Sequence, residues 1–279
     1  MHTHRSLPVL ALACVASAAP CAMATVNIEK YRMALAEDGA AGSASLGITS
    51  KTGNVDFFET SLAGTGGFRE SRHLLLAVVS GTYSAKRTGS DRLEDPAGSL
   101  LDSDARYANK LLGALRYNYG FSDRLAGELF TQLQYDQFLL LDLRSLGGVG
   151  ARLTVLDGDK GNVHAGTGYM IEYESQDPDL VAEDPTTLAH RWTSYLSFAI
   201  EPIDGLTLSS TAYAQPRITD FADYRLLNES ALSVGLGEHF SLGIAFTLRH
   251  DSDPVRLVDG EPPLVATDTS ITNKISLEF

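Results

Sequence analysis

The chain has 279 residues, with 22 lysines and arginines against 35 aspartates and glutamates, and a formal net charge of −13 at pH 7. Proteins that bind nucleic acid neutralise its phosphates with clustered basic groups, so this acidic balance argues against nucleic acid as a partner. No proline-rich or serine-rich linker divides the sequence, and we therefore expect one large domain.

The first 24 residues have the pattern of a secretory signal peptide. Arg5 precedes an apolar run over residues 7–19, and a small-residue Ala-Met-Ala site occupies residues 22–24. The run contains Pro8 and is too short to span a bilayer. Both cysteines, Cys14 and Cys21, lie in this segment. Pro20 is a poor fit to the small residue expected before a lipid-anchored cysteine, so we expect cleavage of an exported chain that keeps no cysteine.

After residue 19, no apolar stretch approaches the ~20 residues of a spanning helix. Residues 25–42 are predicted to be a periplasmic leader, which either forms a short helix or stays loosely ordered. If the exported chain sits in a membrane, it does so as a closed β-barrel, because only that alternative satisfies every backbone polar group in lipid.

From residue 43 onward, strands alternate with turns without interruption, and residues 43–279 are predicted to form the barrel. The expected strands cover residues 43–50, 55–69, 73–86, 106–121, 124–138, 144–156, 163–175, 189–202, 206–216, 224–237, 239–251 and 267–279. Twelve is an even number, as bacterial single-chain barrels have. The predicted class is an all-β, closed antiparallel transmembrane barrel of the outer-membrane type.

The links between these strands alternate in length. Tight turns are expected at 70–71, 122–123, 157–162, 203–205 and 238, whereas longer polar links cover 87–105, 139–143, 176–188, 217–223 and 252–266. Only the first link, residues 51–54, breaks this rule. Short turns on the periplasmic side and long loops outside are typical of outer-membrane barrels, and an even strand count places both termini in the periplasm.

The last expected strand alternates between apolar and polar residues and ends on Phe279. We expect it to pair with the first strand, and Phe279 to act as an assembly signal for the outer-membrane insertion machinery. Most strands are longer than the 5 or 6 residues usual in a soluble sandwich, which is the alternative fold. Aromatic residues lie near strand ends, where membrane interfaces favour them: Tyr107, Tyr117, Tyr119, Phe121, Tyr135, Tyr169, Tyr173 and Trp192.

Several turn and strand motifs carry a family resemblance. They are Ser-Lys-Thr-Gly-Asn-Val-Asp at residues 50–56, Arg-Tyr-Asn-Tyr-Gly-Phe-Ser-Asp-Arg at 116–124, Asp-Tyr-Arg-Leu-Leu-Asn-Glu-Ser-Ala-Leu at 223–232 and Leu-Arg-His-Asp-Ser-Asp-Pro at 248–254. With them the chain resembles the domain-of-unknown-function 481 family, whose members are often labelled salt-induced outer membrane proteins. The resemblance implies a barrel in the outer membrane of a Gram-negative bacterium, used under salt or acid stress, and it carries over no catalytic residue.

Charged residues on the expected inner faces are the candidate site: Arg116, Glu128, Arg152, Glu172, Glu229, Arg249 and Lys274. One interpretation is a charged lumen that conducts or selects small ions and solutes. The other is a structural envelope protein, in which these charges pair across a lumen that side chains fill. Lipid and lipopolysaccharide of the outer membrane are the expected surroundings of either form.

A hydrolase at the outer rim is the alternative function. His250 and Asp251, with Asp253 or Asp136, could supply a histidine and a carboxylate. No Gly-x-Ser-x-Gly elbow is present, and spacing alone fixes no geometry, so we predict no catalytic residue. The acidic segment with Asp177, Asp179, Glu183 and Asp184, and the turn that starts at Asp157, are weak cation motifs that we interpret as solvated loops. We predict neither a metal nor a cofactor.

Overall fold

The protein was analysed as a computed structural model, in which the structure describes residues 38–52, 55–88, 109–158, 160–236, 240–258 and 264–277. The predicted signal peptide, most of the leader and Phe279 lie outside these residues. The described part contains no helix that is long and apolar enough to cross a membrane.

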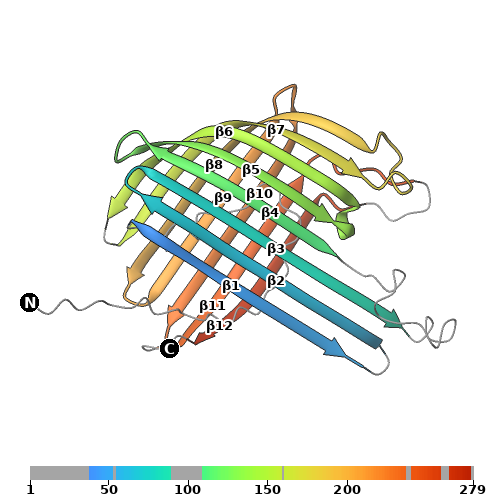
Figure 1. Cartoon of the computed structure of the whole chain (residues 1–279), viewed down its shortest axis with the longest axis horizontal. Coiled ribbons are helices and arrows are strands. Elements are labelled where there is room, and N and C mark those ends of the chain that lie inside the picture. Colours follow the sequence, from blue (N-terminus) through green and yellow to red (C-terminus); the bar gives the residue numbers. More distant parts are fainter. Residues whose placement is uncertain are drawn as a thin grey trace, which may run out of the picture.

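Twelve strands form a single antiparallel sheet in which each strand pairs with its neighbours along the chain (Figure 1). The strands are β1 (Gly39–Lys51), β2 (Val55–Glu70), β3 (His73–Thr88), β4 (Lys110–Gly120), β5 (Leu125–Asp136), β6 (Leu141–Gly158), β7 (Gly161–Gln176), β8 (Thr186–Ile203), β9 (Leu206–Arg217), β10 (Asp220–Gly235), β11 (Phe240–Asp251) and β12 (Thr267–Leu277). One turn of 3-10 helix, η3 (Gln137–Leu139), joins β5 to β6. This arrangement is not the two stacked sheets of a sandwich.

The sheet curls so that it has a concave inner face and a convex outer face (Figure 1). Its number of strands, their order and their antiparallel pairing confirm the prediction. Among the described residues, however, no ladder joins β1 to β12, so the predicted closure is not seen.

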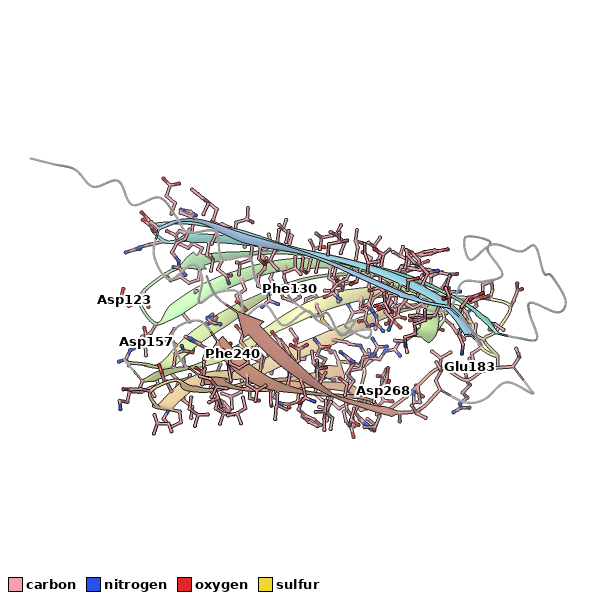
Figure 2. All side chains as sticks on the ribbon, turned by 90° about the horizontal axis from the view of Figure 1, so that it is seen from below. Asp123, Phe130, Asp157, Glu183, Phe240 and Asp268 are labelled. Atoms are coloured by element: carbon pink, nitrogen blue, oxygen red, sulfur yellow. The ribbon has the colours of Figure 1, made fainter. Side chains whose placement is uncertain are left out.

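The two ends of the sheet differ in their links. Figure 2 shows Asp123 and Asp157 at one end, which we name the turn end, and Glu183 and Asp268 at the other, the loop end. The turn end carries the short links 71–72, 121–124, 159–160, 204–205 and 236–239. At the loop end, residues 89–109, 177–185 and 252–266 are the longer links.

Two predicted loops at the loop end are wrong, because strands occupy most of them. β6 begins at Leu141, so only residues 137–140 separate it from β5, and β10 begins at Asp220 directly after a turn at 218–219. Aspartate is depleted in strands and favours turns, which is why the sequence around Asp220 and Asp223 suggested a loop. In the structure, Asp223 is buried and paired with arginines, so the strand continues through it.

Side chains on the two faces are sorted in the reverse of a soluble protein. On β5, Leu129 and Leu133 point outward and are 56% and 55% exposed, whereas Glu128, Gln132 and Gln134 point inward and are buried. Alternation of this kind places every second residue on one face. The same sorting recurs on β6 to β8, where leucines and Trp192 are exposed and arginines and glutamates are buried. The polar interior and apolar exterior therefore extend across several neighbouring strands, at least from β5 to β8.

One part of the inner face is apolar. Leu74, Leu76 and Val78 of β3 are buried there, and Ala41, Leu112 and Ala114 pack against them. The polar inner surface is thus concentrated on β4 to β11.

Glycines on the inner faces of β6 and β7 make room for aromatic rings. A Cβ on Gly148 would overlap the Phe130 ring, and one on Gly166 would overlap the Tyr195 ring. Both rings consequently lie flat against the sheet instead of standing away from it. Glycine is favoured where another group must approach the backbone this closely.

Candidate functional site

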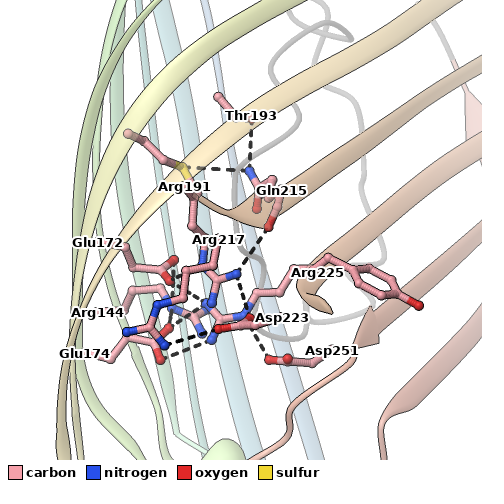
Figure 3. A network of polar contacts seen from close by, with 12 residues as sticks. Arg144, Glu172, Glu174, Arg191, Thr193, Gln215, Arg217, Asp223, Arg225 and Asp251 are labelled. Carbon is pink, nitrogen blue, oxygen red and sulfur yellow. Dashed lines mark hydrogen bonds and ion pairs between the residues drawn. The ribbon is translucent and has the colours of Figure 1, made fainter. Parts of the chain in front are cut away.

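Eight charged side chains meet on the inner face near the loop end (Figure 3). We name them the arginine–carboxylate network: Arg144 on β6, Glu172 and Glu174 on β7, Arg191 on β8, Arg217 on β9, Asp223 and Arg225 on β10, and Asp251 on β11. Strand alternation turns all of them inward. Four guanidinium groups face four carboxylates, so the formal charges of the network cancel.

Arg225 on β10 connects the glutamates of β7 with the aspartate of β11. Its Nη1 donates to Glu172 Oε1 and to Glu174 Oε1, both at 2.7 Å, and its Nη2 donates to Glu174 Oε2 at 3.1 Å. Its Nε donates to Asp251 Oδ2 at 2.8 Å. Because β8 and β9 lie between β10 and β7, the glutamates would be about 14 Å away along a flat sheet. The contacts therefore require the sheet to curve.

Arg191 supplies a second crossing, meaning a contact between strands that are not neighbours in the sheet. Its Nε donates to Glu172 Oε1 at 3.1 Å, and its Nη1 donates to Asp223 Oδ1 at 2.9 Å and to the Gln215 carbonyl at 3.2 Å. Arg191 thus links β7, β9 and β10 from its position on β8. Every one of these contacts has an ionised partner or a fixed carbonyl, which strengthens the hydrogen bond.

The remaining arginines complete the network at its edges. Arg144 Nε donates to Glu174 and lies 3.7 Å from Glu172 Oε2. Arg217 Nη1 lies 3.4 Å from Asp223 Oδ2. Glu172 is 1% exposed, and its Oε2 has no hydrogen-bond partner.

Burial makes these pairings obligatory. The side chains of Glu172 and Arg191 are 1% and 4% exposed, and removing such charges from water costs several kcal/mol for each ion unless a partner compensates. Mutual attraction and hydrogen bonds roughly offset that cost, so buried ion pairs contribute more to a defined geometry than to net stability. The network therefore fixes how β6 to β11 curve around the interior.

A second polar cluster lies closer to the turn end, around Glu128. Glu128 Oε1 accepts from Asn118 Nδ2 at 2.7 Å, and its Oε2 accepts from the Tyr195 hydroxyl at 3.1 Å. Arg116 Nη1 lies 3.7 Å from Glu128 Oε2, and Arg152 Nη1 donates to the Tyr195 hydroxyl at 3.4 Å. These contacts join β4, β5, β6 and β8. A small pocket remains between this Glu128 cluster and Tyr213.

The seven predicted inner-face charges are distributed over both clusters and beyond them. Arg116, Glu128 and Arg152 are buried together in the Glu128 cluster, and Glu172 belongs to the arginine–carboxylate network. Glu229 and Arg249 lie half-buried on β10 and β11. The side chain of Lys274 and all of Phe279 lie outside the described residues.

Sequence reasoning missed most of the network. Glu174 and Arg191 follow the same alternation as Glu172, so that pattern could have identified them. Arg225 also follows the alternation that placed Glu229 inward within the expected strand 224–237. Asp223 could not be found in the same way, because that strand began at residue 224 and left Asp223 in a loop. Its inward position became clear only from the contact with Arg191.

The rim residues suggested for hydrolysis do not come together in the described structure. His250 and Asp251 are neighbours on β11 and therefore point to opposite faces. His250 Nδ1 lies 2.8 Å from Thr267 Oγ1 on the neighbouring strand, whereas Asp251 accepts from Arg225. Asp136 is buried and lies 3.4 Å from Lys110 Nζ. The structure thus gives the histidine and carboxylate interpretation no support.

The acidic loop between β7 and β8 uses its carboxylates locally. Asp177 Oδ1 accepts from the Asp179 N–H, and Asp184 Oδ1 accepts from the N–H and hydroxyl of Thr186. These hydrogen bonds lower the pKa of Asp184 below its usual value. Among the residues that the structure describes, no group of three or more histidine, cysteine, aspartate or glutamate side chains is arranged to hold a metal ion.

Loss of one member of the network is expected to cost more than loss of a matched pair. Arg225→Met should lower the free energy of unfolding by about 3–5 kcal/mol, because it leaves three buried or half-buried carboxylates without their shared partner. Adding Glu174→Gln should recover part of that loss. Equilibrium unfolding in urea measures both variants.

Arg256→Met is the matched control, because Arg256 is 76% exposed and its ion pair with Glu183 lies on the surface. Its effect should stay within about 0.5 kcal/mol. An Arg225→Met variant that is no less stable than Arg256→Met would show that the network carries no such constraint.

Comparison with known proteins identifies the family of this chain. A solved structure titled "NanC porin structure in rhombohedral crystal form" aligns with a TM-score of 0.43 and 10% sequence identity, covering 86% of this chain and 97% of the other. No curated protein sequence matches the chain. The sequence profile described as "Protein of unknown function, DUF481" matches residues 44–275, which include all the turn and strand motifs noted in the sequence. The chain therefore belongs to the DUF481 family, as its motifs predicted.

Proposed function

We propose that the protein is an outer-membrane β-barrel in which β1 and β12 pair to close the sheet, and that ion pairs constrict its lumen to a small, largely closed pore. The observation that carries this proposal is the reversed polarity of the two faces. The family resemblance adds a use of this envelope protein under salt or acid stress.

The outer face is suited to lipid and not to water. Leucine, isoleucine and valine side chains from most strands are exposed on it, including Leu46 at 66%, Ile48 at 67% and Ile271 at 70%. Soluble monomers rarely expose contiguous apolar patches larger than a few hundred Å². A surface of this kind that runs around the whole sheet fits the hydrocarbon core of a bilayer.

Closure follows from the same environment. In lipid, the unpaired N–H and C=O groups along the edges of β1 and β12 would each cost several kcal/mol. With twelve strands, β1 and β12 are antiparallel and can satisfy one another. An apolar exterior thus favours a closed sheet.

Tyrosine and histidine pairs on the outer face fit the membrane interfaces. His73 Nδ1 lies 2.7 Å from the Tyr117 hydroxyl near the turn end, and the Tyr224 and His250 rings are 5.5 Å apart near the loop end. Aromatic residues with polar tips are favoured at the level of lipid headgroups. In this proposal they contact outer-membrane lipid and lipopolysaccharide, and the C-terminal strand with Phe279 engages the barrel assembly machinery.

The second part of the proposal is that paired side chains narrow the lumen. The arginine–carboxylate network lies on the inner face near the loop end and the Glu128 cluster lies nearer the turn end, and the charges within each are paired. Twelve strands fall between barrels of eight, which side chains fill, and of sixteen, which leave an aqueous channel. We therefore place the protein among narrow pores that conduct little while the network is intact.

The membrane assignment is tested by a charge on the outer face. Leu129→Arg should destabilise the barrel by about 2–4 kcal/mol in lipid, because the guanidinium would have to enter the hydrocarbon layer. Folding titrations in vesicles measure this cost. Val265→Arg is the control, since Val265 is 67% exposed in the link between β11 and β12 and lies outside the proposed membrane layer. Equal, near-zero effects of both substitutions would contradict a lipid-facing surface.

Closure is tested with cysteine pairs. The native cysteines lie in the predicted signal peptide, so introduced thiols have no competitors in the exported chain. Leu46→Cys or Ile48→Cys, combined in turn with Thr269→Cys, Ile271→Cys or Asn273→Cys, should give an intramolecular disulfide in one register. Gel mobility with and without reductant detects it. Leu46→Cys with Leu129→Cys on β5 is the negative control, and folded protein that cross-links in no β1–β12 register would refute closure.

Conductance tests the constricted lumen. The native protein should show little single-channel current in planar bilayers, and Arg225→Met with Glu174→Gln should conduct several-fold more, because the pair removes the Arg225 crossing together with one of its carboxylate partners. Arg124→Met, at an exposed arginine of the turn end, is the surface control. Large, stable native channels that the double variant leaves unchanged would overturn the proposal of a constricted pore.

A further inference from the structure

Two links at the loop end are joined to each other. The link 177–185 between β7 and β8 meets residues 252–258 of the link between β11 and β12 in an antiparallel bridge at Val181 and Leu257. The Ala182 N–H donates to the Arg256 carbonyl at 2.9 Å, and the Val258 N–H donates to the Leu180 carbonyl at 3.1 Å. We name this bridge, with residues 177–185 and 252–258 on its two sides, the loop latch.

Each half of the loop latch is anchored to the sheet. On one side, the Asp177 N–H donates to the Leu140 carbonyl at 3.0 Å, which ties the link to the turn between β5 and β6. On the other side, Ser252 Oγ accepts from the Tyr224 N–H at 2.7 Å and donates to the Ala222 carbonyl at 2.9 Å. The latch therefore has fixed ends and one contact in its middle.

The loop latch continues the strands that the network joins. Glu174 lies two residues before the end of β7, and Asp251 is the last residue of β11. Arg225 connects these two carboxylates inside the sheet, and the links that follow the same two strands connect to each other beyond it. The latch thus connects the ends of β7 and β11 beyond the sheet, as Arg225 connects these strands inside it, and it lies closer to the loop end.

The contact in the middle of the latch is small. Val181 is buried, at 6% exposed, but the ion pair beside it joins Arg256 and Glu183, whose side chains are 76% and 65% exposed. Exposed ion pairs of this kind contribute little. Apart from the single bridge, the two halves thus have weak contacts with one another, and such a contact opens more readily than a strand ladder.

We propose that the loop latch is a gate for the loop-end mouth, so that a small solute reaches the arginine–carboxylate network only when the bridge between Val181 and Leu257 opens. The barrier at the mouth is then separate from the ion pairs below it. This inference concerns access to the interior and goes beyond the proposed pore.

Val181 and Leu257 are suited to a disulfide that locks the latch. Because the hydrogen bonds flank this pair and do not join it, Val181 and Leu257 are a non-hydrogen-bonded pair, whose side chains come closest in antiparallel ladders. Their Cα separation in such a pair falls within the range that a disulfide bridges. Oxidised Val181→Cys/Leu257→Cys should therefore hold the latch closed.

Ala189→Cys reports access to the network from the loop end. Ala189 is buried on the inner face of β8, at 4% exposed, where it pairs with Glu172 of the network and lies on the loop-end side of Arg191. With the full chain in detergent micelles, a small cationic methanethiosulfonate should label Ala189→Cys at least tenfold more slowly in the oxidised Val181→Cys/Leu257→Cys background than in Ala189→Cys alone. Val181→Asp, which places a charge in the bridge, should instead speed labelling.

The controls separate the gate from other causes. Ala189→Cys alone should label at one rate before and after the same oxidation step, and peptide mapping should show the 181–257 disulfide. Equal labelling rates in the locked, native and Val181→Asp proteins, or failure of the two cysteines to form a disulfide in folded protein, would overturn the proposal. Neither membrane insertion nor conductance enters this experiment, so its failure is distinguishable from failure of the proposed pore.

Discussion

Ion pairing across the concave face is the constraint on which the rest of this structure depends. The inner face carries charges that are nearly inaccessible to water, and a buried charge must find a partner or lose its ionisation. Arg225 and Arg191 each find at least one partner on a strand that is not a neighbour. A flat sheet would leave these partners too far apart, so pairing and curvature depend on one another.

Two glycines on the inner face make room for aromatic rings inside the curved sheet. Within the same inner rows of β6 and β7 as the charges, Gly148 and Gly166 have no side chain, and the rings of Phe130 and Tyr195 occupy the space above them. The Tyr195 hydroxyl then reaches Glu128 on β5 from β8. A larger side chain at Gly166 would lift the ring off the sheet and remove this second crossing, so the glycines and the polar clusters act together.

How much of this was predictable depends on the range of the interaction. Period-two alternation is local, and it predicted all twelve strands and the inward position of Arg116, Glu128, Arg152 and Glu172. The same period also shows why His250 and Asp251 could not act together, since adjacent strand residues face opposite ways. The inward position of Asp223, by contrast, depended on a partner elsewhere on the sheet. Local propensity favours a turn around Asp223, and only burial against Arg191 turns that segment into a strand.

In the proposed pore, the arginine–carboxylate network and the loop latch would be two barriers at the loop end, and they would respond differently to a solute. The network is buried, its charges are balanced, and moving one side chain leaves others unpaired, so it rearranges as a unit or not at all. The loop latch has a single bridge and an exposed ion pair, and it can open without disturbing the strands beneath it. Opening the latch alone would admit a solute to the upper surface of the network but not through it. A charged solute that competes for Arg225 or Glu174 would then be the one able to loosen the second barrier, because it replaces the partner that it displaces.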